Sequence, residues 1–217
     1  MKKRVLFSIV TILFFCGVAK AQKYEGLAKT PPMGWNSWNY FHSTINEQDI
    51  KDMADAMVAT GLRNAGYIYV NIDDYWHGDR DVNGFMNCDP NKFPHGMKAL
   101  ADYVHSKGLK IGIYSDAGSK TSGGTKSGSR GHEYQDALQY ARWGIDYLKY
   151  DWNFAGNRNK EEAFSVMSDA IRQAGRPMVF SVSESGYGKP WLFCKNICHM
   201  WRTSHDIIPK FSEGAGC

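Results

Sequence analysis

Two periodicities of apolar and polar residues alternate along the chain. Alternating or continuous apolar runs, typical of strands, are found at residues 31–38, 67–76, 109–116, 145–151, 177–185 and 198–204. Apolar residues three and four positions apart predict helices at residues 45–66, 97–108, 132–144, 159–175 and, in a shorter form, 189–196. Strand–helix alternation at this spacing predicts βα units on a parallel sheet. Residues 118–131, rich in Gly, Ser and Thr, are expected to form a mobile loop.

Polar or aromatic residues lie where each predicted strand ends. They are Trp38, Asp73 with Asp74, Tyr114 with Asp116, Lys149 with Asp151, Glu184, and Arg202 with Asp206 just beyond. A doubly wound sheet would spread these ends along an edge, whereas a (β/α)8 barrel gathers them around one mouth. No G-x-G-x-x-G follows the first strand, which removes the main signature of a dinucleotide fold. We therefore expect a TIM-type α/β barrel with one polar pocket.

The residue types at these strand ends are typical of a sugar-binding site. Carboxylates, a lysine and an arginine bind hydroxyl groups, an aromatic face packs on a sugar ring, and two carboxyls can cleave a glycosidic bond. Lys149 and Asp151, two residues apart on one strand, point to the same face, where an internal ion pair and a functional site are equally plausible. The seven histidines show no metal-ligand spacing, so we expect no metal site.

The first 21 residues are predicted to be a signal peptide. A basic start, an apolar run and the small-residue site "AKA" before Gln22 predict an exported protein, periplasmic or extracellular, without stable membrane insertion after cleavage. This segment holds 4 of the 26 basic residues and no acid, so the remainder has 26 − 4 = 22 basic and 22 acidic residues. Such a balance gives no electrostatic case for nucleic-acid binding. The remaining cysteines, Cys88, Cys194, Cys198 and Cys217, are too few for a disulfide scaffold, and we expect Cys194 and Cys198 to be packed thiols.

Five motifs resemble one known family. "PPMGWNSWN", "NIDDYW", "GIYSDAG", "YLKYDWN" and "MWRTSHDI" are similar, in order and spacing, to the α-galactosidases of glycoside hydrolase family 27 in clan D, over about Leu27 to Phe211. The resemblance implies a (β/α)8 barrel without a cofactor and a retaining double displacement on terminal α-galactosides. It implies Asp151 as nucleophile and Asp206 as acid/base. Implied substrate contacts are Trp38, Asp73, Asp74, Tyr114, Lys149, Glu184 and Arg202.

These roles set physical requirements. Retention places the two carboxyls about 5–5.5 Å apart. Lys149 is expected to favour the carboxylate form of Asp151. Asp206 must be protonated, so its pKa is expected to be raised by burial or by the charge of Asp151.

The chain departs from the family pattern at several positions. Many members have cysteines at the positions of Ser122 and Asn153, and of Ser43 and Tyr75. The family's "CEW" after the fifth strand reads "SES" here, which keeps Glu184 and thereby favours a free 2-hydroxyl over an N-acetyl group.

Six strands are predicted, whereas a complete barrel has eight. Residues 22–217 are therefore expected to form an incomplete catalytic barrel, without the last strands and without the family's β-sandwich domain. Alternatives to an α-galactosidase are a β-L-arabinopyranosidase or an α-N-acetylgalactosaminidase on the same scaffold. A further alternative is an inactive remnant or sugar-binding fragment. The sequence does not indicate linkage preference or oligomeric state.

Overall fold

The structure is a computed structural model and describes residues 23–206. The predicted signal peptide at residues 1–21, and the chain from residue 207 onward with Cys217, lie outside the described residues. Export and the domain limits at residues 22 and 217 therefore stay predictions.

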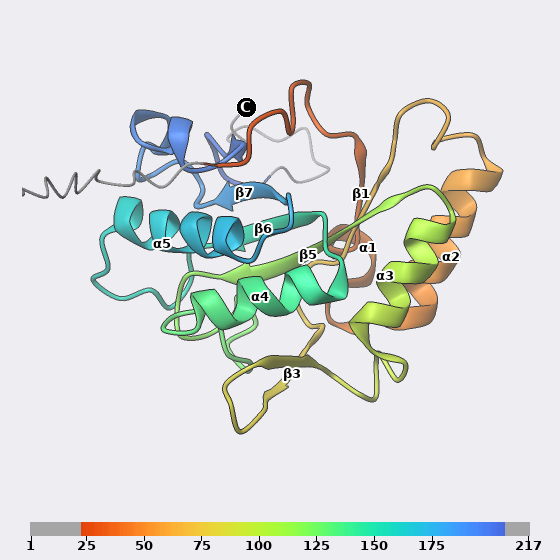
Figure 1. The fold of residues 1–217 in the computed structure, drawn as a ribbon, viewed down its shortest axis with the longest axis horizontal. Coiled ribbons are helices and arrows are strands. Elements are labelled where there is room, and N and C mark those ends of the chain that lie inside the picture. The colour runs from red at the N-terminus through yellow and green to blue at the C-terminus, as the bar shows by residue number, and fades with distance from the viewer. Residues whose placement is uncertain (1–22, 207–217) are drawn as a thin grey trace, which may run out of the picture.

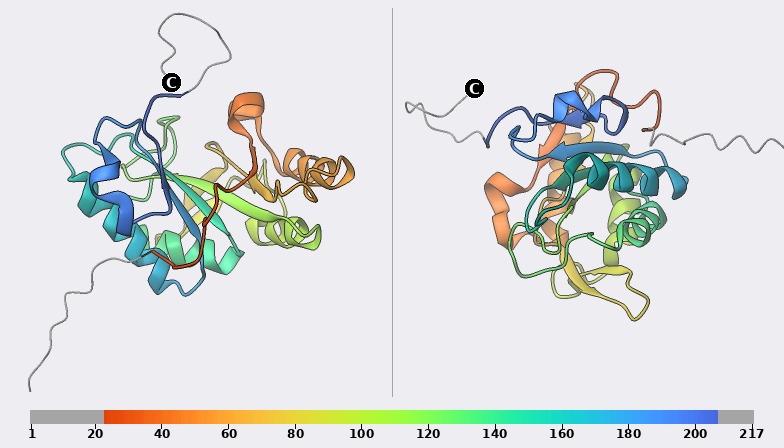
Figure 2. Two further views of the ribbon diagram at one scale, coloured as in Figure 1. Left: turned by 90° about the horizontal axis from the view of Figure 1, so that it is seen from above. Right: turned by 90° about the vertical axis from the view of Figure 1, so that its left-hand side faces the viewer.

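A parallel sheet of six strands forms the centre of the described chain. Its members are β1 (Gly34–Asn36), β2 (Tyr69–Asn71), β5 (Lys110–Asp116), β6 (Tyr147–Asp151), β7 (Val179–Ser183) and β8 (Met200–Trp201). Each strand pairs in parallel with the next one along the chain, in the order β1-β2-β5-β6-β7-β8. The sheet is curled (Figures 1 and 2). An order without reversal, in a curled sheet, confirms six units of a (β/α)8 barrel and excludes a doubly wound sheet.

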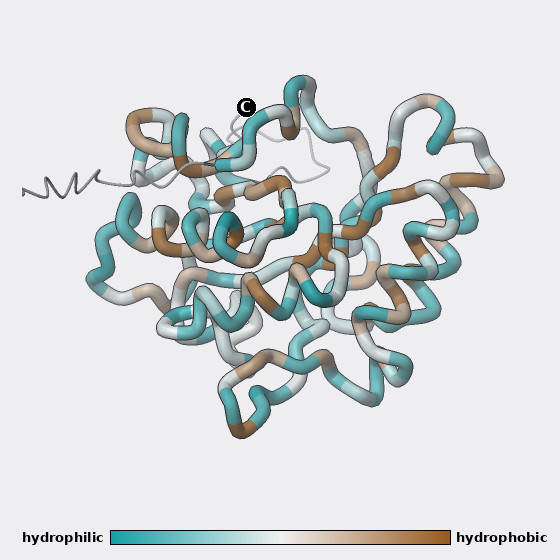
Figure 3. Tube along the Cα trace, in the orientation of Figure 1, coloured by the Kyte–Doolittle hydropathy of each residue, from teal (hydrophilic) through white to brown (hydrophobic). Residues whose placement is uncertain are grey.

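Helices follow the strands and cover the outer face of the curled sheet (Figure 2). The longer ones are α2 (Glu47–Ala59), α3 (Gly96–Ser106), α4 (Glu133–Trp143) and α5 (Lys160–Gln173). The last three are close to their predicted ranges, whereas α2 ends well before residue 66. Short ones are α1 (Trp38–Phe41), η1 (His42–Thr44), η2 (Pro190–Leu192) and η3 (Cys194–Asn196). Asn46 begins α2 with a capping box, and Asn159 caps α5. Hydrophobic and hydrophilic segments alternate along these helices, as amphipathic helices require (Figure 3).

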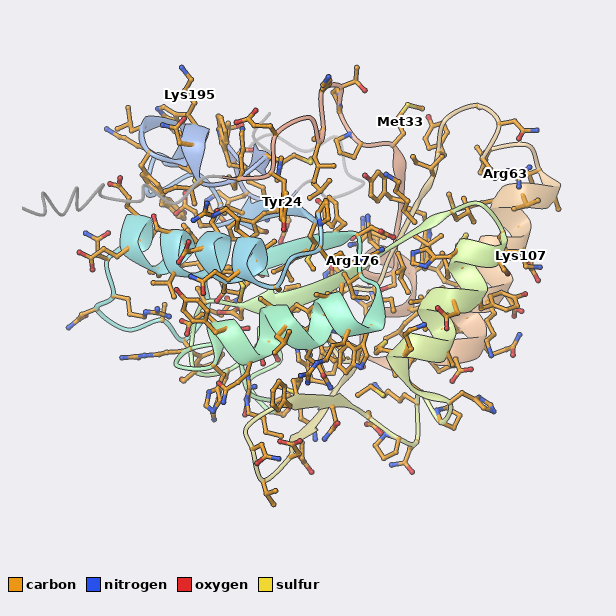
Figure 4. The ribbon with its side chains drawn as sticks, in the orientation of Figure 1. Tyr24, Met33, Arg63, Lys107, Arg176 and Lys195 are labelled. Atoms are coloured by element: carbon orange, nitrogen blue, oxygen red, sulfur yellow. The ribbon has the colours of Figure 1, made fainter. Side chains whose placement is uncertain are left out.

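The core lies between the outer face of the sheet and the helices. Ile113 from β5 and Leu148 from β6 are fully buried there with Val104 of α3 and Phe164 of α5. At the amino-terminal ends of the strands, the Arg176 guanidinium donates to the Asp146 carboxylate (2.6 Å) and anchors the start of β6 (Figure 4). This end is separate from the strand ends that were predicted to hold the site.

A two-stranded hairpin was not predicted. It consists of β3 (His77–Arg80) and β4 (Met86–Cys88), which pair antiparallel outside the main sheet. Residues 67–76 were predicted to form one strand, but β2 is limited to Tyr69–Asn71. The dipeptide Asn83-Gly84, a strong hairpin signal, lies between β3 and β4 and could have identified them. Arg80 joins the hairpin to α4 through two hydrogen bonds to Asp136 (2.5 and 2.8 Å).

The cysteine predictions agree with the described residues. Cys194 and Cys198 are buried free thiols, as expected, and Cys88 is also free. Ser43 and Tyr75 occupy two positions at which many family members are expected to have cysteines. Here the Lys92 ammonium links these positions by donating to the carbonyls of Ser43 (2.6 Å) and Tyr75 (3.1 Å). Within residues 23–206, no helix is long and apolar enough to cross a membrane.

Candidate active site

The period-two pattern of β6 places two charged side chains inside the curl of the sheet. Leu148 and Tyr150 are fully buried on the helix-covered face. Lys149 and Asp151 therefore occupy the opposite face, at the carboxyl end of the strand. This is the placement that the spacing of the two residues predicts.

A cavity of about 180 Å³ lies at the carboxyl ends of the strands. Its lining comprises Trp38, Asp73, Ser122, Lys149, Asp151, Asn153, Ser185, Arg202 and Asp206. Six of the nine predicted site residues are among them, drawn from positions up to 168 residues apart in the chain (206 − 38). The predicted convergence of the strand ends on one pocket is therefore present in the structure.

Asp151 is held by two hydrogen bonds. Its Oδ2 accepts from the Tyr114 hydroxyl (3.1 Å), and its Oδ1 accepts from the backbone N–H of Trp152 (3.1 Å). Burial raises the pKa of Asp151, and the positive charge of Lys149 opposes that rise. Lys149 thus favours the carboxylate, as expected, but the effect of burial is larger.

Lys149 is paired with Asp73. Its ammonium lies 2.8 Å from Asp73 Oδ2, which also accepts from the Asn36 side-chain amide (2.8 Å), and 5.3 Å from the centre of the Tyr114 ring. Burial lowers the pKa of Lys149, but the Asp73 carboxylate more than compensates, so the pKa is raised overall. Lys149 therefore forms its ion pair with Asp73 rather than with Asp151, and Asp151 faces a polar cavity, so a functional site here stays a prediction.

Asp74 holds the loop that covers one side of the cavity. Its carboxylate accepts from the Ser122 hydroxyl (2.7 Å) and the Gly123 N–H (2.9 Å). Burial favours a higher pKa for Asp74, but the nearby His77 ring and the hydrogen bonds from Ser122 and Gly123 outweigh burial and keep the pKa well below its usual range. The loop expected to be mobile is thus anchored to Asp74, which does not itself line the cavity.

Tyr114 lies between two carboxyl groups. Its hydroxyl is 3.1 Å from Asp151 and 3.3 Å from Asp116. Asp116 is fully buried and accepts hydrogen bonds from the Gly118 N–H (2.8 Å), the Asn153 N–H (2.9 Å) and the Asn153 side-chain amide (2.7 Å). Burial raises the pKa of Asp116 to about 7, with the charge of Asp151 contributing.

Several residues of the site were not identified from the sequence. Asp116 was noted at a strand end but received no role, although it shares a strand face with Tyr114. The others hold a carboxylate or line the cavity: Asn36, Ser122, Asn153 and Ser185. Small polar residues in loops give no periodic signal, so only the tertiary structure identifies them.

Arg202 and Asp206 form an ion pair on the far side of the cavity. Their side chains approach to 2.8 Å, and Arg202 also donates to the Ser204 carbonyl (2.9 Å). The side chain of Asp206 is 81% exposed. Burial, one of the two influences expected at Asp206, is therefore absent in the described residues, whereas the influence of the Asp151 charge stays a prediction.

Glu184 does not line the cavity. Its buried carboxylate forms an ion pair with Lys160 at the start of α5 and accepts from the Gly188 N–H (2.9 Å). The next residue, Ser185, has φ +60° and lines the cavity instead. The structure thus brings together eight of the nine predicted residues, directly or through a hydrogen bond to a lining residue, and separates Glu184 from them.

The arrangement suits bond cleavage by carboxyl groups. Asp151 and Asp206 line one cavity together with a lysine, an arginine and an aromatic ring. Within residues 23–206, no group of three or more His, Cys, Asp and Glu side chains is placed to hold a metal ion. Paired carboxyls beside hydroxyl-binding side chains are the arrangement that glycoside hydrolysis uses.

Comparison with known proteins identifies the family. The family model described as alpha galactosidase A matches residues 30–213. The chain belongs to the α-galactosidases of glycoside hydrolase family 27. The family assignment and the glycoside hydrolase class that the five motifs predict are confirmed.

Relatives of this family resemble the chain in sequence and fold. An alpha-galactosidase A from Cellvibrio japonicus is 57% identical over 96% of this chain and 52% of its own length. The crystal structure of alpha-galactosidase I from Mortierella vinacea has a TM-score of 0.85 at 42% identity, over 87% of this chain and 49% of that one. The Saccharomyces cerevisiae enzyme, solved with raffinose, has a TM-score of 0.84 at 37% identity, over 88% and 43%. The chain spans about half the length of the curated relatives it matches.

Family members with other specificities are less similar. A β-L-arabinopyranosidase from Geobacillus stearothermophilus has a TM-score of 0.71 at 26% identity, covering 82% of this chain and 54% of that one. A structure titled as a putative alpha-N-acetylgalactosaminidase from Bacillus halodurans has a TM-score of 0.59 at 26% identity, covering 74% and 50%. Both proteins have lower sequence identity to this chain and lower TM-scores than the two α-galactosidase structures above.

Proposed function

We propose that the protein removes terminal α-D-galactosyl residues from oligo- or polysaccharides by a retaining double displacement. The observation that supports this proposal best is the cavity in which Asp151 and Asp206 lie with Trp38, Lys149 and Arg202. The relatives named as α-galactosidases support the same substrate class. A small cavity of about 180 Å³ suits a single terminal sugar ring, as an exo-acting enzyme requires.

Asp73, Lys149 and Trp38 bind the galactose ring in this proposal. Asp73 and Lys149 are already paired, so their remaining lone pairs and N–H groups are fixed in direction before the sugar arrives. Trp38 presents its ring at the cavity wall, stacked on Tyr75 with 6.1 Å between the ring centres. A pre-formed set of donors, acceptors and an aromatic face recognises a pyranose with little loss of conformational entropy.

Asp151 is the nucleophile. Its carboxylate attacks the anomeric carbon while the bond from that carbon to the leaving oxygen breaks, and a galactosyl ester of Asp151 forms. The Tyr114 hydroxyl and the Trp152 N–H each hold one carboxylate oxygen, which orients the carboxylate. Water then attacks the ester and releases galactose with its original anomeric configuration.

Asp206 is the acid/base. It donates a proton to the leaving oxygen in the first step and removes a proton from water in the second. In the described residues Asp206 is an exposed carboxylate paired with Arg202. A substrate whose hydroxyls bind Arg202 removes that pairing and leaves the Asp206 carboxyl free to contact the leaving oxygen.

A second specificity has one observation in its favour. Glu184 is turned to Lys160, and Ser185 lines the cavity in its place. A small residue on that wall suits a 2-acetamido group, so α-N-acetylgalactosaminide hydrolysis is the second candidate. The expectation that Glu184 selects a free 2-hydroxyl requires it to reach the sugar, which its ion pair with Lys160 opposes.

Activity on aryl glycosides tests these candidates. The protein expressed from its complete reading frame is assayed with aryl α-galactoside, aryl α-N-acetylgalactosaminide and aryl β-L-arabinopyranoside, with Asp151→Ala as the control. We expect the highest kcat/KM on the α-galactoside, no activity of the control, and α-galactose as the first product by proton NMR. Preference for another glycoside overturns the specificity, and binding of galactose without hydrolysis identifies an inactive sugar-binding protein.

We also propose that the protein is exported, on the pattern of residues 1–21. Amino-terminal sequencing of the protein from the periplasm or medium is expected to start at Gln22. A cytoplasmic protein that starts at Met1 contradicts export.

A further inference from the structure

Two aromatic side chains form an exposed pair beside the cavity. The rings of Tyr187 and His205 meet edge to face, with 4.7 Å between their centres and 76° between their planes. Tyr187 is 75% exposed, which is unusual for a large aromatic residue already in contact with a neighbour. Leaving both rings in water forgoes the burial that would stabilise the fold, so the pair is a candidate ligand surface.

The pair is held in place by its backbone. Gly186 packs so closely on the segment before His205 that an added Cβ would lie 2.4 Å from the Thr203 carbonyl oxygen. This contact joins the turn after β7 to the segment after β8, and each segment supplies one ring of the pair. Only glycine permits the approach, so the sequence itself fixes the pair at this position.

The Tyr187–His205 pair lies close to Asp206, the candidate acid/base. His205 directly precedes Asp206, and Ser185, two residues before Tyr187, lines the cavity. His205 also lines a wider hollow that shares Arg202 and Asp206 with the cavity. The acid/base protonates the leaving oxygen, so the leaving group lies on the side of Asp206. The aromatic pair is on that side.

We infer that Tyr187 and His205 form a binding subsite for the sugar ring of the leaving group. The inference rests on the proposed function. The C–H groups of a pyranose pack on an aromatic face, while the Tyr187 hydroxyl and the His205 nitrogens remain able to bind its hydroxyls. The subsite therefore selects galactosides whose leaving group is itself a sugar.

Two other exposed aromatic residues fit this role less well. Phe154 follows the strand of Asp151, but its ring lies beneath the Lys120 ammonium and beside Gly124. Its side chain also has no polar atom that could bind a sugar hydroxyl. Tyr134 lies on α4 and donates its hydroxyl to Asp169, outside the cavity. Tyr134 therefore serves as a matched control: an exposed tyrosine without a role in the subsite.

Two substrates that differ only in the leaving group test the subsite. Hydrolysis of raffinose releases a disaccharide as the leaving group. Hydrolysis of α-galactosyl fluoride releases a fluoride ion, which cannot occupy a sugar subsite. We expect Tyr187→Ala to lower the ratio of kcat/KM on raffinose to kcat/KM on the fluoride about 10-fold, because lost contacts to a remote group reduce transition-state binding. Tyr187→Phe is expected to keep the ratio within about 2-fold, since it retains the ring.

Inhibition gives a second measurement on the same variants. Sucrose, the leaving group of raffinose, is expected to inhibit hydrolysis of the fluoride, and Tyr187→Ala to weaken that inhibition about 10-fold. His205→Ala, which removes the other ring, is expected to lower the ratio of kcat/KM on raffinose to kcat/KM on the fluoride. This variant tests the subsite if Tyr187→Ala does not fold. Tyr134→Ala is expected to change neither measurement.

The possible results separate the subsite from the proposed function. An equal loss on both substrates, or no change in the ratio for either ring variant, overturns the subsite while the α-galactosidase proposal stands. Hydrolysis of neither substrate by the unaltered protein overturns the proposed function, and the subsite with it.

Discussion

The two sides of the cavity are built differently. On the β5–β6 side, Tyr114 and Asp151 come from central strands that pair over five residues, and a partly buried hydrogen bond joins their side chains. On the β7–β8 side, Arg202 and Asp206 follow an edge strand of two residues and form one exposed ion pair. A carboxylate on the first side is fixed by the sheet, whereas one on the second depends on local turns.

This difference suits the two roles proposed for Asp151 and Asp206. A nucleophile needs a fixed direction of attack, which central strands and the Tyr114 hydrogen bond supply. An acid/base must exchange protons with the leaving group and with water, and an exposed position permits that exchange. Changes on the β5–β6 side are therefore expected to have larger effects than changes on the β7–β8 side.

Removing the nucleophile has the largest expected effect. Asp151→Ala is expected to reduce kcat on an aryl α-galactoside by about 10⁴-fold or more, because it removes the carboxylate proposed to form the glycosyl ester. Azide added to this variant is expected to restore part of the rate and to give a β-galactosyl azide. Full activity without azide contradicts the role of Asp151.

Breaking the internal ion pair has the next largest effect. Asp73→Ala leaves the Lys149 ammonium partly buried without its partner, so we expect a loss of about 2–3 kcal/mol in the free energy of unfolding in urea. The control is Asp102→Ala, which removes an exposed ion pair with Lys98 and is expected to cost about 0.5 kcal/mol or less. Equal losses in the two variants show that the Asp73–Lys149 pair is not part of the buried framework.

Asp116 makes the β5–β6 side sensitive to pH. Its pKa, about 7 in the folded protein, exceeds the unfolded value of 3.8, so the folded state binds more protons between these pH values. The stability due to Asp116 is thus greatest at low pH and falls as pH rises from about 4 to about 7. We expect the free energy of unfolding of the unaltered protein, relative to Asp116→Asn, to fall by at least about 1 kcal/mol over this range.

Urea unfolding of both proteins at several pH values measures this difference, and the comparison cancels other titrating groups. Asp74, whose pKa is lowered, acts in the opposite direction and is present in both. A constant difference from pH 4 to pH 7 contradicts a raised pKa for Asp116.

The smallest effect is expected on the β7–β8 side. Ser185 has φ +60°, a conformation that glycine adopts more readily than serine. Ser185→Gly is expected to raise the free energy of unfolding by about 0.5 kcal/mol, whereas Ser185→Ala, which keeps the Cβ, is not. Thermal unfolding of the three proteins checks the order, and a destabilised glycine variant contradicts backbone strain at this turn.

The same division explains how much the sequence could predict. Lys149 and Asp151 were placed correctly because a strand fixes the direction of every second side chain. Glu184 was assigned to the sugar from a motif, but it lies in a turn, and Lys160, 24 residues earlier, competes for its carboxylate. Sequence spacing predicts direction along a strand and does not predict which partner a loop side chain finds.

Burial was the other quantity that the sequence did not determine. Lys149 favours the carboxylate of Asp151, as expected, but the larger effect of desolvation on the pKa of Asp151 was not predicted. Burial was one of two influences expected at Asp206, yet its side chain is exposed in the described residues. Both results depend on what packs over a strand end, and the periodicity of that strand contains no such information.

Trapping the glycosyl-enzyme tests the central claim most directly. A fluorinated galactosyl fluoride that slows the second step of a double displacement is incubated with the protein, and the labelled peptide is identified by mass spectrometry. We predict one galactosyl unit per protein, attached to the carboxylate of Asp151. A label on another residue, or turnover with β-galactose as the first product from an α-galactoside, would contradict Asp151 as the nucleophile of a retaining enzyme.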